Sequence, residues 1–61
     1  MNNTAYFVKT REGTESCYSM EDLISELLYC KEMGEPIKRV LATTSGKQED
    51  VTEWAKMLPL D

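Results

Sequence analysis

The chain opens with a segment rich in aromatic and β-branched residues, Thr4 to Thr10. Such side chains suit the pleated, half-buried surface of a β-strand. Arg11 to Thr14 then supplies a turn, in which Gly13 can take a positive φ without steric cost. The following residues, Glu15 to Tyr18, can pair back along the first strand. The pattern therefore predicts an N-terminal β-hairpin.

Apolar residues recur at helical spacing in the next segment: Met20, Leu23, Ile24 and Leu27. Ser19 can cap the first turn, and Asp22 follows three residues later, as in a capping box. Gly34 and Pro36 end the pattern, because one suits a helix C-terminus and the other cannot continue a helix. We therefore expect a helix from Met20 to Met33.

A third strand is expected over Ile37 to Thr43, and it leaves through a turn at Ser45 to Lys47. Its apolar residues do not alternate cleanly. Ile37 and Leu41 point to one face and Val40 and Ala42 point to the other, so we expect both sheet faces to be covered at least in part. The C-terminal segment could cover the second face.

Near the C-terminus, four residues follow the i, i+3, i+4, i+7 spacing of one helical face: Val51, Trp54, Ala55 and Leu58. Asp50 can cap such a helix and Pro59 stops it. A competing interpretation makes Gln48 to Thr52 a short fourth strand. We prefer the helix and expect the ring of Trp54 to cover the core.

These elements predict an α+β fold of ββαβ(α) order, in which one main helix packs on a sheet of three strands, or of four in the competing interpretation. A short C-terminal helix completes it. With 61 residues the chain has room for one domain, covering residues 1–61. A chain this short buries only about 60% of its unfolded surface, so self-association or a partner is a natural source of further stability.

Charge and hydropathy narrow the possible partners. Eleven acidic residues against seven basic ones give a net charge of -4, which repels nucleic-acid phosphates. No apolar run approaches the roughly 18 residues of a membrane span, and the first residues lack the character of a signal peptide. We expect a cytoplasmic protein that binds neither nucleic acid directly nor a membrane.

The residues that usually carry chemistry are scarce. The chain has no histidine, and Cys17 and Cys30 lack metal-ligand spacing, so free and partly buried thiols are expected. Cys17 has no histidine base to activate it. The segment Thr43 to Gln48 resembles the end of a phosphate-binding loop, but Leu41 stands where a glycine is required. We therefore predict no enzyme, and no catalytic, cofactor or metal site.

Three apolar residues are candidate contacts for a protein partner: Tyr29, Met33 and Leu41. Tyr29 lies almost opposite the apolar stripe of the predicted helix, and Met33 is also rotated away from it. Leu41 shares one face of the third strand with Ile37, and one helix cannot cover all of the apolar residues. A plainer interpretation is that Tyr29 lies along the surface or touches the C-terminal segment.

The chain also resembles short, mostly uncharacterised proteins of bacteriophages and prophages. The resemblance spans most of the sequence and is carried by four segments: Val8 to Gly13, Ser19 to Asp22, Lys31 to Ile37 and Glu49 to Trp54. It supplies no catalytic or binding residues. It implies a class of function, since compact acidic proteins of this kind often bind and redirect a host protein.

The leading hypothesis is a non-catalytic protein-binding module that modulates a host protein and acts by self-association, as a homodimer, or through an apolar surface. The alternative is an acidic inhibitor that occupies a nucleic-acid-binding surface of a host protein. A small enzyme with a site at a dimer interface is third.

Overall fold

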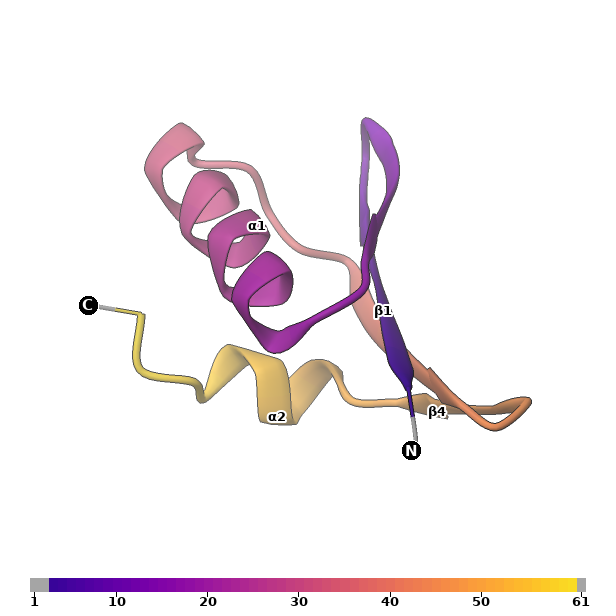
Figure 1. The fold of residues 1–61 in the computed structure, drawn as a ribbon. Helices are drawn as coiled ribbons and strands as arrows, with labels where there is room; N and C mark the ends of the chain where they lie inside the picture. Colours follow the sequence, from indigo (N-terminus) through magenta and orange to yellow (C-terminus); the bar gives the residue numbers. More distant parts are fainter. Residues whose placement is uncertain (1–2, 61) are drawn as a thin grey trace.

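The computed structural model describes residues 3–60 and contains six elements. In chain order they are β1 (Thr4–Thr10), β2 (Gly13–Cys17), α1 (Met20–Met33), β3 (Arg39–Thr44), β4 (Lys47–Asp50) and α2 (Thr52–Lys56). The strands form one four-stranded antiparallel sheet in the order β2-β1-β3-β4. The predicted α+β fold is therefore confirmed (Figure 1).

The C-terminal region contains both of the elements that competed in the sequence interpretation. A short strand, β4, precedes a short helix, α2. The strand forms because Ser45 and Gly46, with φ of 51° and 79°, make a two-residue turn that pairs Thr44 with Lys47. Positive φ at both central residues is typical of the turns that match the twist of a β-hairpin.

α1 has the predicted bounds and the predicted N-terminal cap. The Ser19 hydroxyl accepts a hydrogen bond from the Asp22 backbone N–H at 3.1 Å. At the other end Gly34 takes the left-handed conformation with φ of 68°, and the Glu35 N–H donates to the Cys30 carbonyl at 2.8 Å. Local capping residues thus set both ends of the helix.

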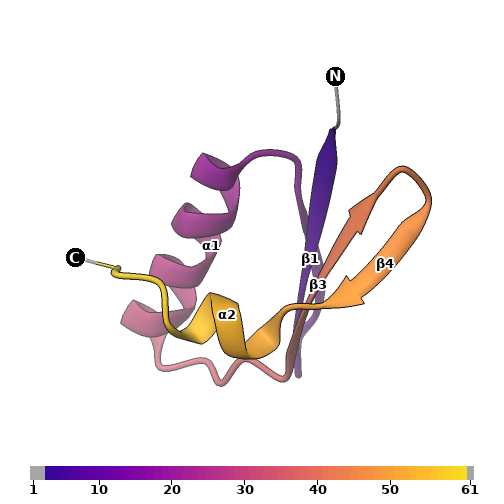
Figure 2. The ribbon, with the colours of Figure 1, turned by 90° about the horizontal axis from the view of Figure 1, so that it is seen from below.

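Both helices lie on the same side of the sheet, as the two perpendicular views show (Figures 1 and 2). The expectation that the C-terminal segment covers the second face is therefore wrong. The reason lies at the start of α2, where the Val51 N–H donates to the Val40 carbonyl at 2.9 Å. The Thr52 hydroxyl also accepts from the Val40 N–H at 3.0 Å. These bonds hold the chain beside β3 as it turns toward α1.

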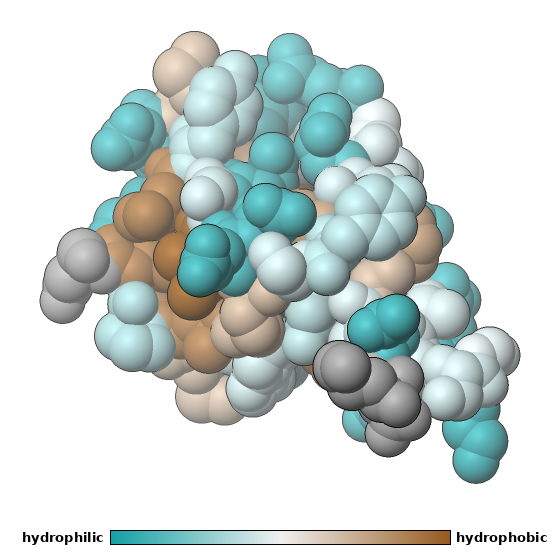
Figure 3. All heavy atoms as spheres, viewed as in Figure 1, coloured by the Kyte–Doolittle hydropathy of each residue, from teal (hydrophilic) through white to brown (hydrophobic). Residues whose placement is uncertain are grey.

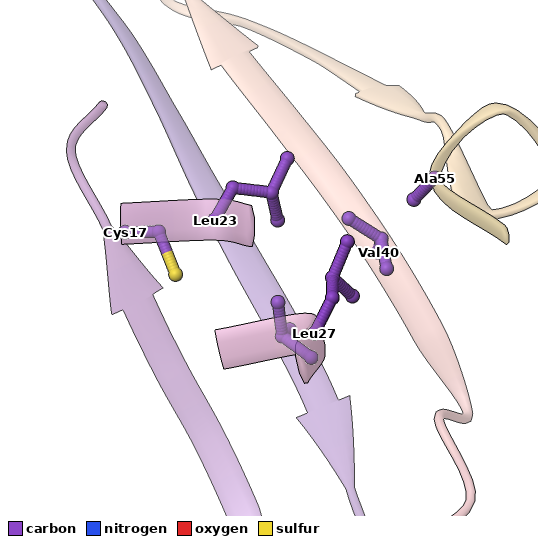
Figure 4. Close-up of a cluster of buried hydrophobic side chains, with 6 residues drawn as sticks. Cys17, Leu23, Leu27, Val40 and Ala55 are labelled. Carbon is purple, nitrogen blue, oxygen red and sulfur yellow. The ribbon is translucent and has the colours of Figure 1, made fainter. Parts of the chain in front are cut away.

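The core lies between the sheet and the helices (Figure 4). Its buried cluster draws on five of the six elements and comprises Val8, Cys17, Leu23, Leu27, Val40 and Ala55. Leu58 and Leu60 pack against its border. On the surface, apolar atoms gather between α1 and the C-terminal segment, where that border lies (Figure 3).

Trp54 does not cover the core as expected. Its side chain is 40% exposed, and its ring stacks on Tyr6 with 6.0 Å between ring centroids and 20° between the ring planes. Tyr6 in turn packs against the buried cluster. Ala55, the small neighbour of Trp54, occupies the position closest to the core, so the large ring is displaced to its rim.

The opposite face of the sheet carries no helix within residues 3–60, and we call it the helix-free face. Val8 and Val40 point toward the helices, so their strand neighbours point away. Cross-strand partners share a face, and the pairing therefore assigns the following residues to the helix-free face: Ala5, Phe7, Lys9, Thr14, Ser16, Arg39, Leu41, Thr43, Gln48 and Asp50.

Candidate functional site

The structure separates the three candidate contacts. Tyr29 and Met33 are 55% and 65% exposed on α1, whereas Leu41 lies in β3 on the helix-free face. Tyr29 and Met33 are four residues apart, so they are neighbours on the helix surface. The sheet lies between them and Leu41. One flat partner surface therefore cannot contact all three residues.

An apolar cross-strand pair lies at the centre of the helix-free face. Phe7 in β1 is directly opposite Leu41 in β3, and both side chains are partly exposed. Ser16 flanks Phe7 on one side, and Asp50 flanks Leu41 on the other. Cross-strand aromatic and aliphatic pairs of this kind stabilise a sheet by their mutual contact. Here the outer surface of the pair also stays partly accessible.

The charged residues of the helix-free face are few and unevenly placed. Lys9 and Arg39 are direct cross-strand neighbours, and Asp50 is the acidic strand residue on this face. Arg39 Nε lies 3.5 Å from Asp50 Oδ2, with both side chains more than half exposed. The pKa of Asp50 is lowered mainly because its carboxylate accepts hydrogen bonds from Thr52, with a smaller effect of Arg39.

A basic groove begins at the same end of the face. It has a volume of about 370 Å³, and Lys9, Lys38 and Arg39 supply its charge. The remaining lining comes from the tip of the β1–β2 hairpin, at Thr10, Gly13 and Thr14. This end of the sheet is therefore locally positive in a chain whose net charge is -4.

The other side of the hairpin tip borders an acidic cleft of about 350 Å³ between the hairpin and α1. We name it by its full lining: Thr10, Glu12, Gly13, Thr14, Glu15, Glu26, Tyr29, Cys30 and Glu35. Arg11 Nε contacts Glu35 Oε1 at 3.1 Å, and the Glu35 side chain is only 10% exposed. This ion pair joins the hairpin to the loop after α1 and involves one of the four glutamates of the cleft.

Both thiols are free and buried. Burial, followed by the nearby Glu26 carboxylate, raises the pKa of Cys17 to about 11. Burial also raises the pKa of Cys30 to about 11, and its thiol donates a hydrogen bond to Glu26 Oε2 at 3.5 Å. A thiol that stays protonated near neutral pH is a poor nucleophile. Neither cysteine is therefore arranged as a reactive group.

Sequence reasoning missed Phe7, Lys9 and Arg39 as members of the candidate surface. Their proximity depends on the register between β1 and β3, which pairs residues 30 or more positions apart. The alternation of side chains along a strand could have placed Phe7 on the other face of the sheet from Val8, because adjacent strand residues point to opposite faces. The register itself had no local signal.

Within residues 3–60, no three cysteine or acidic side chains lie close enough to hold a metal ion, and neither helix is long and apolar enough to cross a membrane. Comparison of the chain with protein-family models, curated proteins and solved structures finds no match.

Proposed function

We propose that this chain is a non-catalytic protein-binding module that acts through the helix-free face of its sheet. The observation that carries the proposal is the Phe7–Leu41 pair, which lies at the centre of that face with no helix over it in the described part of the chain. A small domain gains stability when a partner covers apolar surface that its own elements leave open. Leu41 is thus the main candidate contact.

The resemblance to short phage and prophage proteins supports a host protein as the partner whose action the module modulates. We further propose that the module works in the cytoplasm. The two free thiols support this location, because reducing compartments keep cysteines unpaired. Self-association through the same face is compatible with this function, since an apolar surface can bind a second copy until a partner displaces it.

A second candidate function uses the acidic cleft. Four glutamates and the half-exposed Tyr29 line one concave surface, which would attract a basic segment of a partner and compete with nucleic acid for it. Such binding would depend strongly on ionic strength, because the carboxylates act mainly through long-range attraction. Binding through the helix-free face would depend on it much less.

Affinity capture with three matched baits tests the two functions. Tagged wild type, Leu41→Ser and Tyr29→Ser are incubated with lysate of the host cells at about 50 mM and about 500 mM salt. Circular dichroism first verifies that each variant is folded. Both substitutions replace one partly or half-exposed apolar side chain by serine, so each serves as the control for the other.

We expect wild type and Tyr29→Ser to retain the same protein at both salt concentrations, and Leu41→Ser to lose it. Loss on Tyr29→Ser together with loss at high salt would favour the acidic cleft instead. Retention by all three baits, or by none, would contradict binding through either surface. Met33 lies next to Tyr29 and is expected to behave like it.

A further inference from the structure

The occupant of the helix-free face can be derived from the arrangement of its charges. The face has an apolar centre between Phe7 and Leu41, a basic pair at one end and a single acidic residue at one side. Arg39 already pairs with Asp50 in the same copy at 3.5 Å, whereas Lys9 has no ion-pair partner within residues 3–60. A partner that fits should therefore place negative charge over Lys9, and it can share the exposed Asp50 carboxylate. This chain itself carries both charges on the same face.

The spacing of a β-sheet gives the positions of these groups. Neighbouring strands are about 4.8 Å apart, and residues two positions apart along a strand are about 6.8 Å apart. Asp50 lies one strand beyond Leu41, so it is about 7 Å from the centre in the direction across the strands. The Lys9–Arg39 pair lies two residues from the centre, about 7 Å along the strands.

Asp50 and the Lys9–Arg39 pair thus lie at equal distances from the centre, in perpendicular directions. A two-fold axis that runs diagonally across the face exchanges these two positions. We propose that a second copy of this chain covers the helix-free face about such an axis, so that the strands of the two copies cross at nearly a right angle. Asp50 of each copy then lies against Lys9 of the other while it keeps its ion pair with Arg39 of its own copy. Orthogonal crossing is one of the two usual ways in which β-sheets pack face to face.

The same symmetry operation pairs the remaining residues of the face without conflict. It brings Phe7 and Leu41 onto the same pair in the second copy. Thr14 falls near Gln48 of the second copy, where the hydroxyl and the amide can form a hydrogen bond. Ser16 falls over Ala5 and Thr43, which are small enough to admit it. No like charges meet among the strand residues of this face.

The proposed interface is small. Four strands of this length present roughly 400 Å² per copy, about half of a standard protein–protein interface. The dimer should therefore be weak, with a dissociation constant in the micromolar range or above. This weakness suits an assembly that another protein can displace. The inference rests on the proposed function, since it names the occupant of the same surface.

Charge exchange between two variants provides a specific test. Lys9→Glu places a negative charge against Asp50 of the second copy, and Gln48→Lys places a positive charge over Thr14 of the second copy, directly beside its Lys9. Each variant alone should dimerise about tenfold more weakly than wild type. An equimolar mixture should recover heterodimers of wild-type affinity, because the introduced carboxylate of one variant then meets the introduced ammonium group of the other. Both positions are exposed, so neither change disturbs the core.

Lys47→Glu is the matched control, because Lys47 lies in β4 beside Gln48 but points to the other face. Sedimentation equilibrium over about a thousandfold range of concentration measures all association constants. Wild-type dimerisation, weakening by both variants, recovery in the mixture and no effect of Lys47→Glu would establish the proposal. A monomeric wild type, no recovery, or equal weakening by Lys47→Glu would overturn it.

Failure of this inference can be distinguished from failure of the proposed function. A monomeric wild type whose captured partner is lost on Leu41→Ser would refute the second copy as occupant and leave the binding function intact. A dimer that shows the charge exchange, with no partner affected by Leu41→Ser, would establish self-association and refute the modulation of a host protein through this face.

Discussion

The two faces of the sheet differ in what covers them, although the same strands build both. Val8 and Val40 are fully buried beneath the helices, whereas the adjacent Phe7 and Leu41 stay partly exposed on the helix-free face. α1 has 14 residues and α2 only five, and both lie on the covered side. The helices of residues 3–60 therefore cover one face, and the second apolar pair stays partly exposed.

The sharpest contrast between the faces is expected from truncating one leucine on each. Leu27→Ala should lower the free energy of unfolding by about 3 kcal/mol, because it leaves a cavity in the buried cluster. Leu41→Ala should cost about 1 kcal/mol in dilute solution, since its side chain is already partly exposed. Urea denaturation at low protein concentration measures both values. Equal losses would show that the two faces are similarly covered.

The free energy of unfolding above pH 9 should report whether water is excluded from the cysteines on the covered face. Cys17 and Cys30 have a pKa near 11 in the folded protein and 9.0 as the reference. A raised pKa stabilises the folded state below the reference value, and that stabilisation is lost as pH rises from 9 to 11. The full loss is at most about 3 kcal/mol per thiol.

The measurement compares urea denaturation of wild type and of the Cys17→Ala Cys30→Ala variant at pH 8 and pH 10. All other ionisable groups are common to the two proteins, so the difference between their pH responses isolates the thiols. Wild type should lose more stability than the variant. Identical responses would mean that water reaches the thiols and that the covered face is not dry.

The attachment of α2 to the covered side should depend on one hydroxyl. The Thr52 Oγ1 accepts from the Val40 N–H at 3.0 Å, and Thr52→Val keeps the shape of the side chain while removing this acceptor. An unpaired backbone N–H should cost about 1 to 2 kcal/mol. Trp54 fluorescence should also report a looser helix. No change in either signal would mean that the Val51–Val40 backbone hydrogen bond and the packing of Ala55 hold α2 without this hydroxyl.

The sequence predicted the covered face better than the helix-free one, for physical reasons. Ser19, Gly34 and the helical spacing are local signals, so α1 was predicted with its observed bounds. The strand and the helix after Gly46 are not mutually exclusive, as the sequence interpretation assumes. Both form, because β4 needs only four residues and α2 only five. Short elements of this kind lie at the limit of what periodicity can resolve.

The candidate surface was predicted only in part. Tyr29, Met33 and Leu41 are candidates because they are apolar residues that one helix cannot cover. This criterion judges each residue separately. It cannot tell that Leu41 pairs with Phe7 while Tyr29 faces the acidic cleft, since both depend on tertiary packing. The sequence also could not predict on which face of the sheet the C-terminal segment packs, because tertiary hydrogen bonds to Val40 determine that face.

The smallest expected effect has the opposite sign and lies on the helix-free face. The Thr43 Oγ1 is buried and has no hydrogen-bond partner within residues 3–60. Thr43→Val replaces this hydroxyl by a methyl group of similar size, and it also suits a strand. The free energy of unfolding should rise by about 1 kcal/mol, because an unpaired buried hydroxyl is removed. Chemical denaturation of the two proteins in parallel measures the change.

Thr52→Val is the matched comparison: the same substitution should destabilise where the hydroxyl is paired and stabilise where it is not. A loss of stability at Thr43 would mean that its hydroxyl binds a group supplied from outside this face.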